Sequence, residues 1–281
     1  EATSLMGKPL VPMTLPEADR TKLEANLKAA QDDLATAPDS ADALVWVGRR
    51  QAYLWHYRDA IATFTQGIER FPNDPRFYRH RGHRYLTVRN FDGAVADLEK
   101  AAALIKGEPD EIEPDGAPNA AGKPRSTLQF NIWYHLGLAY YLKGDHANAR
   151  RAYDECLKVS DNDDSITAIT DWQWMNYMRM GDKVAAAKVL ARITPKMDIL
   201  ENASYHKRLL MYKGLEKVET LLDTANADDL TIATQGYGVG NYYFVMGDEA
   251  KAKEIFDRVL AGKQWAAFGY IAAEVDRSKM Q

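Results

Sequence analysis

A pattern of small residues recurs along the chain at a fixed interval. Gly48 and Gly82 lie 34 residues apart, and Ala60 and Ala94 each follow one of these glycines by 12 residues. Self-similarity at a fixed period of roughly 20 to 50 residues indicates a stack of repeated helical or mixed units. The chain has 281 residues, which is longer than one compact core usually supports, and this also favours a repeat array.

We number positions within frames of 34 residues that begin at Ala41, Pro75 and Phe130. The three frames have similar residues at the same positions. Positions 8 and 20 are small, whereas positions 4, 7, 11 and 24 are mostly large and apolar. Small residues let two antiparallel helices approach closely, and the large residues fill the seam between them. Each frame therefore predicts a pair of packed helices.

The third frame contains Trp133-x2-Leu136-Gly137-x2-Tyr140, which resembles the signature of the tetratricopeptide repeat (TPR) family. Further frames begin near residues 167, 201 and 233. Glycine followed by aspartate marks the turn between two helices at 144–145, 181–182 and 247–248. The resemblance covers about residues 16–278. It implies an all-α, right-handed superhelical solenoid of about six helix pairs with an extra capping helix at each end.

The frames divide the chain into segments. In chain order we expect an N-terminal arm (1–15), an N-terminal capping helix (16–40), TPR repeats 1 and 2 (41–108), an acidic insertion rich in glycine and proline (109–129), TPR repeats 3 to 6 (130–266) and a C-terminal capping helix (262–281).

In the TPR family the first helix of each repeat lines a concave groove, mainly through positions 2, 5, 6, 9 and 12 or 13. The resemblance therefore implies these ligand-binding residues: Trp46, Arg49, Tyr53, Arg76, Arg79, His80, His83, Asn131, Tyr134, His135, Trp172, Asn202, Tyr205, His206, Tyr237 and Asn241. Position 6 is a histidine in three repeats, at 80, 135 and 206, and we expect all three to face the groove. Packing of these histidines against neighbouring helices is the alternative.

The chemistry of these positions favours a peptide, or a small polar or anionic ligand. Arginine can bind a carboxylate through two parallel hydrogen bonds, and aromatic rings suit ligands with an apolar face and polar edges. The best-known TPR groove site is a clamp for a peptide C-terminus built from lysine and asparagine. Here its positions hold Val45, Arg49, His80, Asn131 and His135, so that peptide class is disfavoured.

We therefore predict a non-enzymatic interaction scaffold with a protein, peptide or small polar partner, and with no catalytic residue, metal or cofactor. A second hypothesis is a metal-binding protein or enzyme that uses His80, His83 and His135, because two imidazoles on one helical face can contribute to a zinc site. A third is a structural adaptor whose groove stays unused.

Charge patterning adds a prediction about the insertion. Residues 76–90 contain five arginines and no acid, whereas residues 107–122 contain five acids, Asp115 among them, and no base. Opposite charges favour docking of the insertion on the N-terminal half of the groove, with Ile112 as an apolar anchor. A disordered acidic loop is the alternative.

Composition limits the partners and leaves the compartment open. The net charge of −4 gives no basic field for nucleic acid, and no stretch approaches the ~18 apolar residues of a membrane span. The lone Cys156 cannot form an intrachain disulfide. The chain begins at Glu1, and the polar segment to Pro16 favours a mature periplasmic or secreted protein, with a cytoplasmic location as the alternative.

Overall fold

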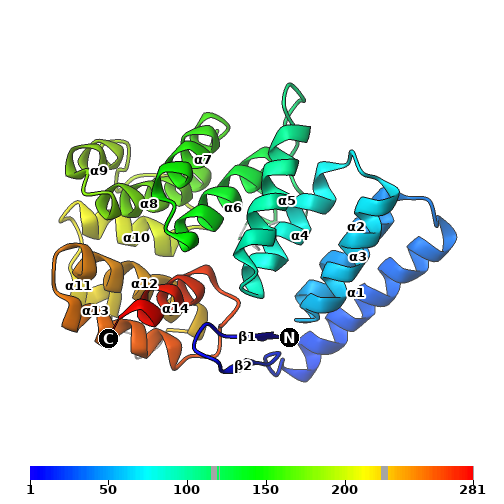
Figure 1. The fold of residues 1–281 in the computed structure, drawn as a ribbon, viewed down its shortest axis with the longest axis horizontal. Coiled ribbons are helices and arrows are strands. Elements are labelled where there is room, and N and C mark those ends of the chain that lie inside the picture. Colours follow the sequence, from blue (N-terminus) through cyan, green and yellow to red (C-terminus); the bar gives the residue numbers. More distant parts are fainter. Residues whose placement is uncertain (115–118, 120, 223–226, 281) are drawn as a thin grey trace. The chain divides into compact units, whose positions relative to one another are not determined.

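The computed structural model of the protein describes residues 1–114, 119, 121–222 and 227–280. The chain forms two compact units, residues 1–108 (unit 1) and residues 109–281 (unit 2). Both units are built from helices (Figure 1), so the predicted all-α fold class is confirmed. Among the described residues, no helix combines the length and the apolar character needed to cross a bilayer.

Unit 1 consists of a short β-hairpin followed by helices that pack in sequence order. Its elements are β1 (Ala2–Thr3), β2 (Pro9–Leu10), α1 (Glu17–Thr36), α2 (Ala41–Tyr53), α3 (Tyr57–Arg70), α4 (Pro75–Thr87) and α5 (Phe91–Leu104). Helix α1 packs on α2, and the pairs α2–α3 and α4–α5 are the first two repeats. The two strands are antiparallel, with Ala2 opposite Leu10, and this hairpin was not expected from the sequence of the arm.

Unit 2 continues the same arrangement of helix pairs. Its helices are α6 (Leu128–Lys143), α7 (His146–Lys158), α8 (Asp163–Arg179), α9 (Lys183–Leu190), α10 (Ala203–Tyr212), α11 (Val218–Leu222), α12 (Asp229–Val245), α13 (Glu249–Leu260) and α14 (Phe268–Lys279). Helices α6 and α7, α8 and α9, and α12 and α13 pack as pairs, and α14 packs on both α12 and α13. The fifth pair is the most abbreviated, because α11 spans little more than one helical turn.

The regular spacing of glycines is explained by close approach between paired helices. A Cβ atom at Gly48 would overlap the ring of Phe64, and one at Gly137 would overlap the ring of Tyr153. At Gly82 a Cβ atom would lie 2.8 Å from Cγ of Leu98. In these three pairs, the glycine at position 8 of the first helix therefore receives the large residue at position 24 of the second, as the frames predict.

At the turns between paired helices, a glycine ends the first helix and an aspartate caps the second. Gly144 ends α6 with φ of 79°, in the left-handed region where a side chain is strained, and the Asp145 side chain then accepts from the backbone N–H of Asn148 to cap α7. Gly181 and Gly247 have φ values of 75° and 91° and precede capping aspartates in the same way. The predicted turn signals are confirmed.

The insertion is held within unit 2 by hydrogen bonds to the segment that leads into α6. Residues 112 and 127 form an isolated β-bridge, and the carboxylate of Asp110 accepts from the Thr127 hydroxyl at 2.6 Å and the Gln129 backbone N–H at 3.0 Å. The predicted role of Ile112 as an apolar anchor is wrong, because the residue is 64% exposed. Asp115 lies outside the described residues.

Candidate ligand-binding surfaces

The first candidate surface is built from α2 and α4 in unit 1. On α2 the guanidinium of Arg49 lies 4.4 Å from the ring centroid of Trp46 and donates from Nη2 to the Tyr53 hydroxyl at 3.1 Å. These residues stand three or four positions apart, so one face of the helix carries all three. The sequence predicted each of them as a groove residue, and the structure brings them into contact.

Helix α4 adds more cationic groups to the same face. Arg79 Nη1 lies 3.0 Å from His80 Nδ1 and 3.5 Å from His83 Nδ1, and since a guanidinium only donates, both ring nitrogens act as acceptors. Burial lowers the pKa of Arg84 to about 10, and the like charges of Arg79 and Arg49 contribute to this lowering. The guanidinium groups of Arg79 and Arg49 therefore both lie within electrostatic range of Arg84, whose guanidinium carbon lies 5.3 Å from the ring centroid of Tyr57 on α3. We call this surface the α2–α4 face: Trp46, Arg49, Tyr53, Arg79, His83 and Arg84.

The remaining arginines in the first part of α4 point elsewhere. Arg76 binds the capping carboxylate of Asp74, with Nε to Oδ1 at 3.0 Å, and also pairs with Asp42. Arg81 forms a two-pronged ion pair with Asp97, at 2.7 and 2.8 Å. These two arginines join neighbouring helices, so Arg76 belongs to the start of α4 and not to the cluster around Arg84.

The predicted residues of unit 2 are brought together differently, as a buried aromatic cluster. The indole Nε1 of Trp172 donates to the Tyr134 hydroxyl at 2.6 Å, and that hydroxyl lies 3.3 Å from the hydroxyl of Tyr205. The hydroxyls of Tyr141 and Tyr237 lie 2.7 Å apart, and Trp172 contacts both of these rings. Trp172 is only 1% exposed. We call these five residues the aromatic cluster.

Charged and amide groups from three helices extend this cluster. Arg179 on α8 donates from Nε to Oδ1 of Asn241 at 2.8 Å and from Nη2 to Asp276 on α14 at 2.5 Å. The Tyr237 hydroxyl donates to the same carboxylate at 3.2 Å. Helix α14 is thereby bonded to α8 and α12 through one side chain, Asp276.

Helix α14 also covers the predicted residues of α6. The ring of Phe268 lies 5.4 Å from His135 and 6.2 Å from Tyr134, measured between centroids. His135 donates from Nδ1 to the carbonyl of Asn131, and the Asn131 side chain donates to Glu113. These predicted groove residues of unit 2 are thus engaged by the chain's own capping helix and insertion.

Two predicted residues at or near α10 contact other segments. On α10, His206 Nε2 donates to the carbonyl of Thr194, in the connection before the helix, at 2.8 Å. Asn202 directly precedes α10 and donates to Asp164 on α8, from its backbone N–H at 2.9 Å and from its side-chain amide at 3.2 Å. Only Tyr205 on this helix reaches the aromatic cluster. A register that places Tyr205 inward turns its neighbour away, because successive residues on a helix do not share a face.

Each of the three histidines at position 6 contacts another part of the chain, and whether they face a common groove stays a prediction. His80 is buried and stacks on the Phe64 ring of α3 at 5.4 Å, His135 faces α14, and His206 faces the α9–α10 connection. In the part of the chain that the structure describes, no group of three or more His, Cys, Asp or Glu side chains is arranged to hold a metal ion.

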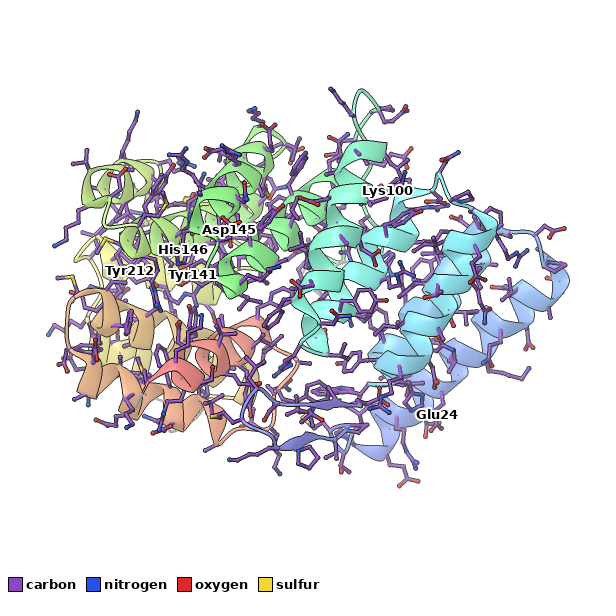
Figure 2. All side chains as sticks on the ribbon, in the orientation of Figure 1. Glu24, Lys100, Tyr141, Asp145, His146 and Tyr212 are labelled. Carbon is purple, nitrogen blue, oxygen red and sulfur yellow. The ribbon has the colours of Figure 1, made fainter. Side chains whose placement is uncertain are left out.

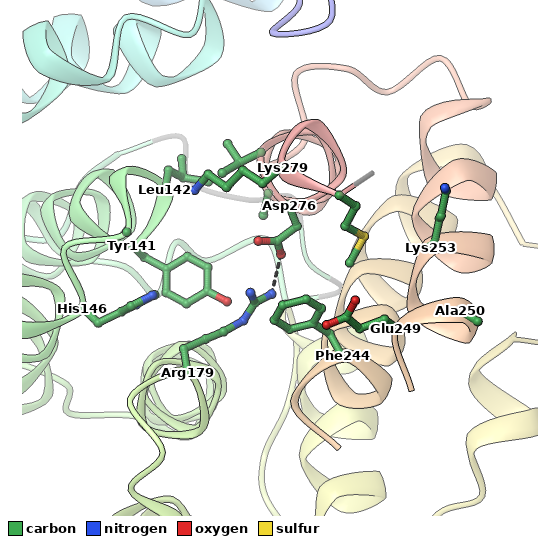
Figure 3. A pocket seen from close by; sticks show the side chains of 14 residues that line it. Tyr141, Leu142, His146, Arg179, Phe244, Glu249, Ala250, Lys253, Asp276 and Lys279 are labelled. Carbon is green, nitrogen blue, oxygen red and sulfur yellow. Dashed lines mark hydrogen bonds and ion pairs between the residues drawn. The ribbon is translucent and has the colours of Figure 1, made fainter. Parts of the chain in front are cut away.

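Unit 2 also contains a cavity of about 480 Å³ next to the aromatic cluster (Figure 3). Two of its lining residues, Tyr141 and His146, lie on either side of the turn between α6 and α7 (Figure 2). His146 donates from Nδ1 to Asn176 at 2.9 Å, and burial lowers its pKa, so the imidazole is neutral at neutral pH. Among the lining residues, Tyr141 and Arg179 stand at groove positions of their repeats and could be predicted from the frames. The lining residues on α13 and α14 do not stand at groove positions, so the frames do not predict them.

Comparison with known proteins agrees with the repeat frames. A family model described as tetratricopeptide repeat matches residues 130–163, which is the predicted third frame. A search of curated protein sequences finds no significant match. Among solved structures, a tetratricopeptide repeat protein from Parabacteroides merdae is 13% identical, with a TM-score of 0.54 over 87% of this chain and 88% of that one.

A second similar structure is the APC/C hetero-tetramer Cut9–Hcn1, again with 13% identity and a TM-score of 0.54, over 93% of this chain and 46% of that one. At this identity the two likenesses concern the fold. Together with the helix pairs, they show that the chain has the fold of tetratricopeptide repeat proteins, and the family model matches one of its repeats.

Proposed function

We propose that this protein is a non-enzymatic scaffold that binds an acidic peptide segment of a partner protein on the α2–α4 face. The tetratricopeptide fold supports a role in protein interaction. We further propose that the bound segment is acidic and that it binds to unit 1.

The observation that carries the proposal is the gathering of Arg49, Arg79 and Arg84. The charges of Arg79 and Arg49 disfavour the charged form of Arg84, and a carboxylate close to these groups would favour it. Each guanidinium offers N–H donors in a planar fork that matches a carboxylate. The rings of Trp46 and Tyr53 lie beside these donors, and the guanidinium of Arg50, 4.6 Å from the Trp46 centroid and 5.6 Å from that of Tyr53, adds a further cation, which suits a peptide with acidic side chains.

The corresponding residues of unit 2 are poorer candidates for an external peptide. Their hydroxyl, indole and amide groups already donate to and accept from one another in the aromatic cluster. A peptide that entered there would have to displace Phe268 from its contacts with Tyr134 and His135. Displacement of an aromatic side chain and of buried hydrogen bonds opposes binding.

The test uses a short fluorescent peptide with alternating glutamates and a twin in which glutamine replaces every glutamate. We expect the glutamate peptide to bind at least about tenfold more tightly, with an affinity that falls as salt is added. The double variant Arg49→Gln/Arg79→Gln should lose most of this preference. Arg70→Gln is the matched control, since Arg70 lies on α3 and pairs with exposed Asp39.

Equal affinity for the two peptides, or the same loss in the control variant, would refute a site on the α2–α4 face. Binding of neither peptide would instead support the adaptor hypothesis, in which the first helices contact no ligand. Circular dichroism of each variant establishes that the helices are retained.

A further inference from the structure

The cavity in unit 2 is walled by elements that are distant in sequence (Figure 3). The α6–α7 turn contributes Tyr141 and His146, the end of α8 contributes Arg179, and Phe244 comes from α12. The start of α13 and the last turns of α14 complete it. All of these elements belong to unit 2, so the cavity is independent of the α2–α4 face and of the function proposed for it.

Arg179 provides the central charged group of the cavity. Its guanidinium carbon lies 4.1 Å from the ring centroid of Phe244, which holds the side chain in place from one side. Two of its five N–H donors are directed to Asn241 and Asp276. The guanidinium is therefore fixed in orientation while it retains donors for a further acceptor.

The remaining lining combines positive charge with apolar surface. Lys253 and Lys279 add two cations, against the carboxylates of Glu249 and Asp276. Asp276 pairs with Arg179 and accepts from Tyr237, so the Arg179–Asp276 pair is neutral as a whole and the net positive charge of the lining comes from Lys253 and Lys279 against Glu249. The apolar part of the lining is Leu142, Phe244, Ala250, Ala272, Val275 and Met280.

We propose that this cavity binds a small organic carboxylate. Its carboxylate would pair with Arg179 and Lys279, and its hydrocarbon part would lie against Phe244 and Val275. The volume is within the ~300–1,000 Å³ of ordinary small-molecule sites. A compact inorganic anion would use the charges and leave the apolar lining uncovered, so the mixed lining favours an organic ligand.

The probe is butyrate, titrated against the full chain at constant ionic strength and followed by NMR chemical shifts, with acetate and inorganic phosphate as comparators. We expect butyrate to bind more tightly than acetate, by about threefold for two additional buried CH₂ groups that are only partly desolvated. Phosphate should bind more weakly than butyrate.

Two variants of exposed lining residues should act in opposite directions. Lys279→Gln removes a cation and should weaken butyrate binding about three- to fivefold, whereas Glu249→Gln removes a like charge and should strengthen it by a similar factor. Lys251→Gln is the matched control: Lys251 is on α13 and pairs with Glu254 outside the cavity, so its loss should leave the affinity unchanged.

The proposal is overturned if butyrate produces no saturable shifts, if phosphate binds as tightly as butyrate, or if the two variants change affinity in the reverse sense. A change in the Lys251→Gln control equal to that of Lys279→Gln would also overturn it, because the effect would then come from net charge alone. None of these outcomes bears on peptide binding by unit 1.

Discussion

Helices α2 and α4 of unit 1 and helices α6, α8 and α12 of unit 2 occupy the same place in their repeats, yet their inward positions carry different chemistry. In unit 1 these positions hold arginines, including Arg49 and Arg79, beside ring faces. In unit 2 they hold Tyr134, Trp172 and Tyr237, which hydrogen-bond with one another and with their neighbours. One repeat geometry thus accommodates either buried arginines beside aromatic rings, as Arg49 and Arg79 in unit 1, or a network of hydrogen-bonded aromatic side chains, as in unit 2.

The difference follows from the hydrogen-bond donors and acceptors that each set of side chains contains. Tyrosine hydroxyls both donate and accept, so a set of them with an indole and an amide can close a network without external partners. Guanidinium groups only donate, so Arg49 and Arg79 bind acceptors such as the Tyr53 hydroxyl and the ring nitrogens of His80 and His83, and their positive charge favours an anionic ligand. The comparison predicts that unit 2 responds mainly in stability to substitution and pH, and unit 1 mainly in binding.

Alkaline pH should separate the two units most strongly. In unit 2, burial raises the pKa of Tyr134, Tyr153 and Tyr237 well above the ordinary value of 10. Above pH 10 the unfolded chain releases these protons while the folded unit retains them. The free energy of unfolding therefore falls as pH rises, by up to about 1.4 kcal/mol per pH unit for each tyrosine.

In unit 1 two shifts oppose each other over the same pH range. Burial raises the pKa of Tyr57 to about 12, which costs stability from pH 10 upward, whereas the pKa of Arg84, lowered to about 10, adds stability because the unfolded chain keeps that proton longer. Pulse proteolysis with peptide mapping should therefore show unit 2 opening first above pH 10. Tyr153→Phe should reduce this loss, since the buried Tyr153 hydroxyl has no hydrogen-bond partner among the described residues. Simultaneous opening of both units would contradict the comparison.

The buried ion pair of unit 2 should give the largest effect of a single substitution. Arg208 on α10 and Asp171 on α8 are both fully buried, with Arg208 Nε donating to Asp171 Oδ1 at 3.0 Å. Asp171→Ala leaves an uncompensated guanidinium inside the unit and should lower the free energy of unfolding by about 3–5 kcal/mol. The double variant Asp171→Leu/Arg208→Met should recover most of this in urea unfolding. The exposed pair Arg277–Asp257 is the control, and Asp257→Ala should cost less than about 1 kcal/mol.

Equivalent glycines in the two units should be equally intolerant of side chains. Gly48→Leu must displace the ring of Phe64, and Gly137→Leu that of Tyr153, so each should cost about 1–3 kcal/mol or more by overpacking. The controls are Ala62→Leu on α3 and Ala147→Leu on α7, both at exposed positions. Thermal melting checks all four. An unchanged melting temperature in either glycine variant would mean that the helix register of that unit is wrong.

The repeat frames were predictable because their determinants are local. A glycine such as Gly137 at position 8 and Tyr153 at position 24 meet within one helix pair, and the intervening turn is encoded by Gly144 and Asp145. The site was less predictable because its contacts join different repeats. Phe268 at the start of α14 reaches Tyr134 and His135 on α6. That contact joins the last helix of unit 2 to its first, so it depends on how all the intervening pairs rotate, and no single frame contains it.

Histidine at a shared repeat position shows the same limit in detail. The frame correctly grouped His80, His135 and His206 by position, but each imidazole contacts a different element. A side chain at position 6 borders both the inner face and the preceding repeat. Small rotations of a helix therefore decide whether it faces a ligand or packs between repeats, and such rotations are not encoded in the spacing.

Tryptophan provides the finest test of the difference between the units. Trp172→Phe removes the N–H that donates to the buried Tyr134 hydroxyl at 2.6 Å, and should lower the free energy of unfolding by about 1–2 kcal/mol without changing binding of the glutamate peptide. Trp46→Phe retains a ring beside Arg49 but weakens the cation–π contact at 4.4 Å. Because Trp46 is only half-buried, its replacement should cost less than about 0.5 kcal/mol and weaken the glutamate peptide about twofold. Urea unfolding and peptide titration of the two variants measure both quantities side by side. If Trp46→Phe destabilised the chain as much as Trp172→Phe and left peptide affinity unchanged, the α2–α4 face would be a closed interior like that of unit 2.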